Sequence, residues 1–397
     1  MFEVSAEPAA AAIARPRRGR GADLITIMLG TWLLVGVFVD GWAHNNLHGL
    51  ETFFTPWHAL LYSGYLAAGE WILWQLRPAV RGRRLTRTAV PLGYGLGSVG
   101  VVVFGVGGIA DLGWHEVFGI EQDIQALFSP THLMLFLGIA LILSTPLRAA
   151  WLDPHEPAEP TYRGFFPVLA STTMLTAMIA FFFMYWAPFR ESEASRPAMH
   201  YAADHDLTGF YIQDNLAAIL LTTLVLVGAL LLLACRWRLP LGTATTMYAV
   251  VAVLTNALAQ FRDPELIAAA LLAGLAVDIV LATVAPTPAL PRRMSAVGAL
   301  IPLATWVPYY AVLAAVDGLG QAAPVWTGSI VWAVLAGGAL ALLMAPPPVP
   351  VLDPPLGDAR PYTGSGGSPD ASSRSGGATV PPAQPEQEGR QHDGGGH

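Results

Sequence analysis

Residues 128–143 read FSPTHLMLFLGIALIL, a Ser-Pro pair followed by a long apolar run. Serine is a favoured N-cap residue and proline a favoured first helical residue, so a helix is predicted to begin here with His132 in its first turn. Residues 54–58 read FTPWH and open another apolar run, which places His58 in the same way. The chain therefore contains one type of helix start twice.

Apolar runs of this kind dominate the 397-residue chain, which is 54% hydrophobic and 12% charged. About twenty apolar residues cross the roughly 30 Å hydrocarbon layer as a helix, and a helix pairs all its own backbone polar groups in lipid. The sequence predicts an all-α, polytopic integral membrane protein in contact with the lipid bilayer. About ten spans are expected, near residues 24–43, 56–76, 89–112, 130–149, 164–187, 211–235, 241–260, 264–285, 295–316 and 325–345.

The chain is expected to have three parts. Residues 1–22 form a cytoplasmic segment, and residues 23–345 form the transmembrane domain, with tandem hairpins at 23–150. The first apolar stretch is too long for a cleavable signal and no small-residue cleavage site follows it, so it is predicted to be a retained span. Pro, Gly, Ser and Gln dominate residues 346–397, which predicts a disordered cytoplasmic tail.

Arginine placement predicts the orientation. Arginines gather before the first span, after the second span and in later loops on that side, whereas only Arg190, Arg196 and Arg262 fall opposite. The positive-inside rule then puts both termini in the cytoplasm. Every basic residue is arginine and Ala and Gly are abundant, which indicates a GC-rich bacterial genome and hence the bacterial cytoplasmic membrane.

On this topology, histidine is strongly asymmetric. Only His155 of the membrane part is cytoplasmic, and the others fall at the outer face: His44, His48, His58, His115, His132, His200 and His205. The single cysteine, Cys235, excludes a disulfide framework and a thiolate metal cluster within the chain. No basic stripe with interleaved aromatic residues indicates nucleic-acid binding. Any chemistry is therefore expected from histidines and carboxylates at the outer face.

Each repeated helix start is preceded by an Asp and a His four residues apart, Asp40 with His44 and Asp111 with His115. That spacing stacks both side chains on one helix face. Two imidazoles and a carboxylate suit copper, zinc or non-haem iron. An Asp within the outer turns of a span is costly in lipid and is usually retained for function. Two metal triads are predicted, Asp40, His44 and His58, and Asp111, His115 and His132.

Three more histidines are weaker metal candidates. His48 would extend the stripe of His44 if the helix continues. His200 and His205 lie with Asp204 and Asp206 in the loop after the fifth span, where solvated residues are common.

The second copy resembles a known copper site. Residues 111–115 (DLGWH), residues 128–132 (FSPTH) and Phe136 are similar to the copper-site stretch of the C subunit of particulate methane and ammonia monooxygenases. The resemblance implies that Asp111, His115 and His132 bind copper. It covers some thirty residues per copy, with a longer stretch between the two histidines here. The first copy matches the family motif less closely, because its tryptophan has shifted to Trp42. The family subunit has one copy of the motif, whereas this chain has two.

These features lead to one main expectation. The chain binds copper at its outer face and oxidises a small apolar substrate from the bilayer, at an open position beside Trp42, Trp57 and Trp114. The other subunits of the resembling family are absent from this chain, so partner membrane subunits or a homo-oligomer are expected. Whether the triads form separate sites or one shared centre stays open.

Three alternatives remain. The first is copper acquisition or trafficking without turnover, in which intramembrane Glu70 and Asp278 would mark a path inward. Three methionines, Met174, Met178 and Met184, could line a copper(I) path, although a Met-rich face is more often plain packing. The second alternative is haem ligation by histidine pairs, which leaves Asp40 and Asp111 unexplained. In the third the histidines are only interfacial and bind no metal.

Overall fold

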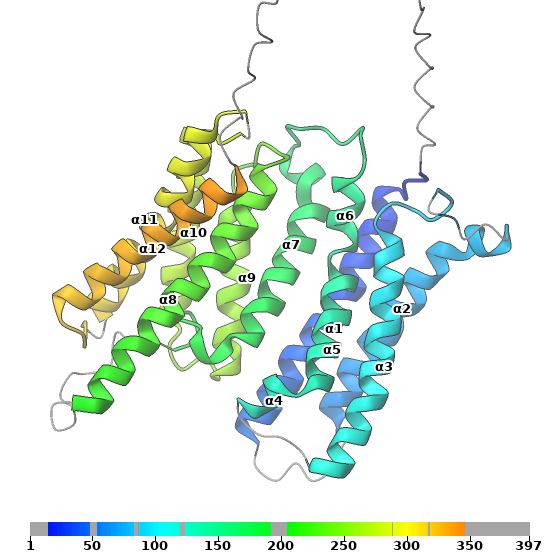
Figure 1. Cartoon of the computed structure of the whole chain (residues 1–397), viewed down its shortest axis with the longest axis horizontal. Coiled ribbons are helices and arrows are strands. Elements are labelled where there is room, and N and C mark those ends of the chain that lie inside the picture. Colours follow the sequence, from blue (N-terminus) through cyan, green and yellow to red (C-terminus); the bar gives the residue numbers. More distant parts are fainter. Residues whose placement is uncertain are drawn as a thin grey trace, which may run out of the picture. The chain divides into compact units, whose positions relative to one another are not determined.

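The computed structural model describes residues 15–47, 54–82, 86, 88–119, 124–191, 205–287, 289–316 and 318–345, and this part of the chain contains helices and no strands (Figure 1). The first half contains α1 (Arg20–Asn46), α2 (Pro56–Arg81), α3 (Tyr94–Phe118), α4 (Gln125–Phe128), α5 (Pro130–Leu143), α6 (Thr145–Trp151) and α7 (Tyr162–Phe182). The second half contains the 3-10 turn η1 (Met184–Trp186), α8 (His205–Ala234), α9 (Thr243–Leu258), α10 (Glu265–Val284), α11 (Pro291–Val316) and α12 (Ala323–Met344). The predicted all-α class is therefore confirmed.

Seven of these helices are long and apolar enough to cross a membrane: α1, α3, α7, residues Gly209–Ala234 of α8, α10, α11 and α12. The pair α5 and α6, bent by 45°, makes an eighth if it is one span. The predicted count of about ten is not confirmed. Polar residues such as Glu70 and Gln75 make α2 less apolar overall, and α9 has 16 residues, about 24 Å of helix.

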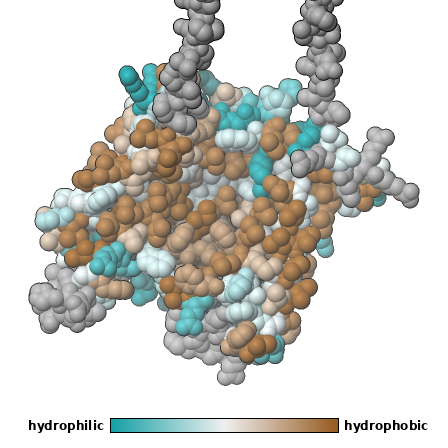
Figure 2. Space-filling view, in the orientation of Figure 1, coloured by the Kyte–Doolittle hydropathy of each residue, from teal (hydrophilic) through white to brown (hydrophobic). Residues whose placement is uncertain are grey.

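The apolar helices identify a multi-pass membrane protein in a lipid bilayer. Figure 2 shows apolar residues covering most of the visible face, with hydrophilic residues mainly toward the helix ends. Residues 346–397, predicted to be a disordered tail, lie outside the described residues.

Two apolar cores meet at α7. Met174, Met178 and Phe181 of α7 pack with buried residues of α1, α2, α3 and α5. Phe165 and Leu169, near the start of the same helix, pack with α8 to α12 instead. Both Asp/His pairs belong to helices of the first core, so the candidate site lies in the N-terminal half of the helical unit.

Within each hairpin, the two helices make a close contact at a glycine, and the two contacts match in position. A Cβ on Gly64 of α2 would lie 2.8 Å from Leu33 Cα of α1, and a Cβ on Gly138 of α5 would lie 2.9 Å from Phe104 Cα of α3. Gly64 is six residues after His58, and Gly138 is six residues after His132. The two hairpins therefore share their close backbone contacts as well as their motifs.

Candidate metal centre

The helix starts predicted from Thr-Pro and Ser-Pro are confirmed. The backbone N–H of His58 donates to Thr55 Oγ1 at 3.1 Å, and that of His132 donates to Ser129 Oγ at 3.3 Å. Pro56 and Pro130 are the first helical residues. Each cap therefore fixes the first turn of its helix and points a histidine toward the end of the preceding long helix.

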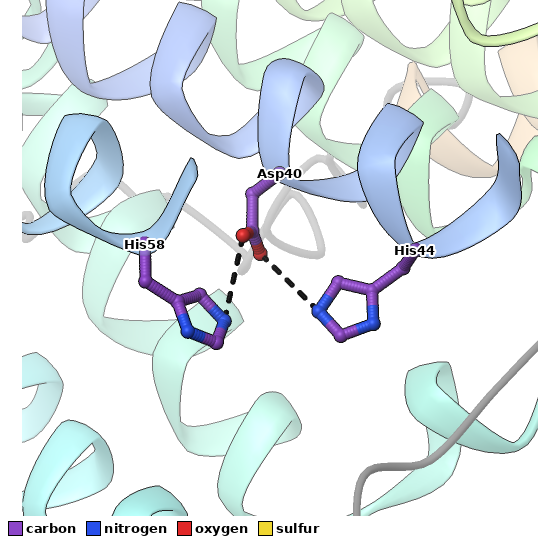
Figure 3. A group of neighbouring side chains, drawn as sticks. All are labelled: Asp40, His44 and His58. Atoms are coloured by element: carbon purple, nitrogen blue, oxygen red, sulfur yellow. Dashed lines mark ion pairs between the residues drawn. The ribbon is translucent and has the colours of Figure 1, made fainter. Parts of the chain in front are cut away.

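The first triad joins the end of α1 to the start of α2. The Asp40 carboxylate lies between two imidazoles, with Oδ1 3.4 Å from His58 Nε2 and Oδ2 3.9 Å from His44 Nε2 (Figure 3). The residue spacing on α1 brings Asp40 and His44 together, and the α1–α2 packing adds His58.

The second triad has the same arrangement between α3 and α5. Asp111 Oδ2 lies 3.4 Å from His115 Nε2, and Asp111 Oδ1 lies 3.5 Å from His132 Nε2. In both copies the Asp therefore presents one oxygen to each histidine.

Both groups could hold a metal ion, since the potential ligand atoms of each lie within 4.8 Å of one another. Ligands about 2.0–2.2 Å from a tetrahedral ion are themselves roughly 3.3–3.6 Å apart. Three of the four carboxylate–imidazole distances are 3.4 or 3.5 Å, and the His44 contact is wider at 3.9 Å. The carboxylate–imidazole spacing therefore suits a metal ion, and the ligand atoms of each triad, which lie within 4.8 Å of one another, would draw closer around it.

The second triad is the more enclosed and the better supported. The Asp111 side chain is 2% exposed and that of Asp40 is 16% exposed. Thr131 Oγ1 donates to Asp111 Oδ1 at 2.8 Å, and Ser129 Oγ lies 2.7 Å from His132 Nδ1. Such outer partners orient metal ligands. In the first copy, tryptophan replaces threonine at the position before the histidine.

The two triads are neighbours. The rings of His58 and His115 have centroids 6.5 Å apart and planes inclined by 32°. His58 belongs to the first triad and His115 to the second, and their helices α2 and α3 pack directly. The arrangement therefore places two potential metal sites side by side.

A cavity of about 70 Å³ connects them. Asp40 and His44 of the first triad and His132 of the second line it. The rest of its wall is largely apolar, from Leu127, Leu135, Phe136, Met178, Phe181 and Met184 among others. A water needs about 10–15 Å³ of such volume, so the cavity fits only a small molecule.

A wider groove reaches the first triad from another side. It lies between α2 and α3, has a volume of about 740 Å³, and is lined by His58, Tyr62, Tyr65 and Ile109 among others. Ile109 is 78% exposed on the outer surface of α3. The groove therefore runs from the apolar surface of the helices to an imidazole of the first triad.

Not every predicted residue joins the site. His48 and His200 lie outside the described residues, and His205 is the first residue of α8, with no described side chain. Trp42, Trp57 and Trp114 do not line the cavity described above. Trp42 instead packs edge-to-face on Trp57, with ring centroids 5.9 Å apart.

The two carboxylates predicted to lie within the membrane, Glu70 and Asp278, are apart from the triads. Asp278 of α10 caps the start of α9, accepting from the N–H groups of Ala244 and Thr245 at 2.9 and 3.0 Å and from Thr245 Oγ1 at 2.6 Å. These bonds give Asp278 a structural role. Glu70 is exposed on the surface of α2.

The repeated motif did not identify the hydroxyl support of the second triad or most of the cavity wall. Thr131 could have been recognised, because it lies within the motif and its hydroxyl can reach an Asp on the preceding helix. Phe181 and Phe182 carry no motif, since they come from α7, more than forty residues after His132. From the sequence, Met178 and Met184 are candidates only for a copper(I) path, and the structure places both in the cavity wall.

Comparison with protein-family models, curated proteins and solved structures found no match to this chain, so the site stands on its own geometry.

Proposed function

We propose that the protein binds copper in two adjacent Asp/His/His sites and uses it to oxidise a small apolar molecule in the cavity beside them. The carrying observation is the repeated triad, in which a carboxylate lies between two imidazole Nε2 atoms in both hairpins. Imidazole and carboxylate ligands also suit zinc and non-haem iron, and the resemblance of the second copy to a copper site favours copper.

Three groups of residues would have different roles at the copper sites. The two histidines and the aspartate of each triad provide three ligands and leave coordination positions for a small molecule. Copper held in this way supplies electron-transfer chemistry that no side chain of the triads has. Thr131 and Ser129 hold Asp111 and His132 in position. Phe136, Phe181 and other apolar side chains form most of the cavity wall.

The cavity supports the choice of substrate. Its volume of about 70 Å³ and largely apolar wall favour a molecule of a few heavy atoms without charge. The groove between α2 and α3 offers a route from lipid to His58, which suits a molecule that dissolves in the bilayer. By the arginine distribution the triads would face outward, with both termini in the cytoplasm of a bacterial cell.

Copper acquisition without turnover is the second candidate. The observation that favours it is the pair of methionines, Met178 and Met184, in the cavity wall. The path inward through Asp278 loses support, because that carboxylate is occupied by its bonds to the α9 terminus.

Haem binding fits poorly. Sites for ligands of comparable size have volumes of roughly 300 Å³ or more. The cavity beside the histidines measures about 70 Å³, and an Asp carboxylate lies between the imidazoles of each triad. The wider groove of about 740 Å³ has one histidine, His58, among its described lining residues, so it offers no histidine pair.

The test is metal content per chain after detergent purification. The native protein should retain about two equivalents of copper, and His58→Ala and His132→Ala should each lose about one. His155→Ala is the control, because this side chain is 89% exposed in a loop away from the triads. Zinc or iron in place of copper would keep the site and overturn the metal assignment. No metal in the native protein would overturn the whole proposal.

A further inference from the structure

The cavity beside the triads contains two thioethers that neither triad uses. Met178 belongs to α7 and Met184 begins η1, and both line the cavity together with Asp40, His44 and His132. They are buried, with 1% and 4% of their surface exposed. Both methionines therefore line the same cavity as one histidine from each triad.

The sulfur of Met184 is held in place. Asn45 Nδ2 donates to Met184 Sδ at 3.6 Å and to Gly41 O at 2.7 Å, while Asn45 Oδ1 accepts from Tyr185 OH at 2.7 Å. Asn45 follows His44 directly in α1, so this network ties Met184 to the turn that carries a histidine of the first triad.

Met174 shows what a packing methionine looks like in the same helix. It lies one turn before Met178 and is 5% exposed. Its sulfur accepts from Thr31 Oγ1 at 3.6 Å, and its methyl carbon lies beneath Gly30. The cavity wall includes Met178 and Met184 and leaves Met174 out.

We propose that Met178, Met184 and His44 form a binding site for monovalent copper in the cavity that the two triads share. Thioethers are soft, uncharged ligands that select copper(I), whereas carboxylates favour harder divalent ions. The cavity would thus contain a soft site that shares the His44 imidazole with the harder first triad. This inference rests on the proposed copper binding at the triads, and it names copper(I) as the oxidation state in which copper enters the cavity.

Silver(I), a redox-inert ion of the same charge and softness, is the probe. Silver nitrate would be titrated into the full-length protein in chloride-free detergent, for the native chain, Met178→Leu, Met184→Leu and the control Met174→Leu. Leucine keeps the volume of methionine closely enough for a core position. Zinc(II) binding, which needs only the triads, would be measured on the same four samples.

The native chain should bind silver(I), and each cavity variant should lose about tenfold or more in affinity, since loss of even an outer partner of a metal ligand costs about that much. Met174→Leu should bind silver(I) as the native chain does, and zinc(II) binding should be equal in all four. Unchanged silver(I) affinity in both cavity variants, or equal loss in Met174→Leu, would overturn the site. If the native chain bound silver(I) but not zinc(II), the triads would be refuted as metal sites and the soft site would still be supported.

Discussion

At the scale of single residues, the two triads differ in how their carboxylates are supported. Thr131 bonds to Asp111, and the matching position of the first copy is Trp57, which has no hydroxyl. Asp111 is also the more buried of the two. A buried carboxylate that keeps a hydrogen-bond donor stays oriented between its histidines, so the second site should be the tighter one.

Thr131→Val should therefore weaken metal binding at the second triad by about 10- to 100-fold, because outer partners of metal ligands contribute that much. The change would be made in a His58→Ala background, so that only the second triad remains to be titrated. Thr131→Ser keeps the hydroxyl and should restore most of the affinity. Equal affinity in the valine and serine variants would show that the bond to Asp111 does not matter for the metal.

At the scale of elements, close helix contacts decide where the ligands meet. Gly64 lets α2 approach the backbone of α1 near Leu33, and Gly138 lets α5 approach α3 near Phe104. Each contact lies about two turns from the histidine that completes a triad. A displaced helix would therefore carry its histidine away from the aspartate.

Gly64→Ala should lower thermal stability and empty the first triad, because its Cβ would lie 2.8 Å from both Leu33 Cα and Leu33 N. Overpacking of this kind costs about 1–3 kcal/mol. Gly113→Ala, in α3, is the matched control, since its Cβ would meet nothing within 4 Å. Melting temperature and metal content of the two variants check the prediction. Native values for Gly64→Ala would mean that the α1–α2 contact does not position His58.

At the scale of the whole molecule, the hairpins place the two triads next to each other. The contact runs through His58 and His115, with ring centroids 6.5 Å apart. Two copper(II) ions bound there would be close enough for magnetic coupling. The electron paramagnetic resonance spectrum of the doubly loaded protein should be broadened by that coupling, and His58→Ala should give the narrow spectrum of a single ion. A narrow, uncoupled spectrum at two equivalents would place the ions far apart.

Orientation in the membrane can be tested with Cys235, which follows α8 at the end rich in arginine. A membrane-impermeant maleimide should label Cys235 in intact cells only after permeabilisation. Phe54→Cys in a Cys235→Ser background should be labelled without permeabilisation, since Phe54 is 82% exposed at the triad end. The reverse pattern would place the triads in the cytoplasm.

The same label gives a pH prediction. Burial raises the pKa of the Cys235 thiol above its usual value, so at a given pH a smaller fraction is the reactive thiolate. In permeabilised cells the labelling rate of Cys235 should keep rising at a pH where an exposed thiol has levelled off. Equal pH profiles for Cys235 and Phe54→Cys would contradict this.

The sequence by itself determined what depends on neighbours along the chain. Apolar runs specified helices, Thr55 and Ser129 specified where two of them begin, and four-residue spacing put each Asp beside one His. Only the tertiary structure decided the rest, namely the pairing of the triads through His58 and His115 and the cavity closed by residues of α7. The physical reason is that these contacts join residues dozens of positions apart, and packing between helices, made close by glycines, brings them together.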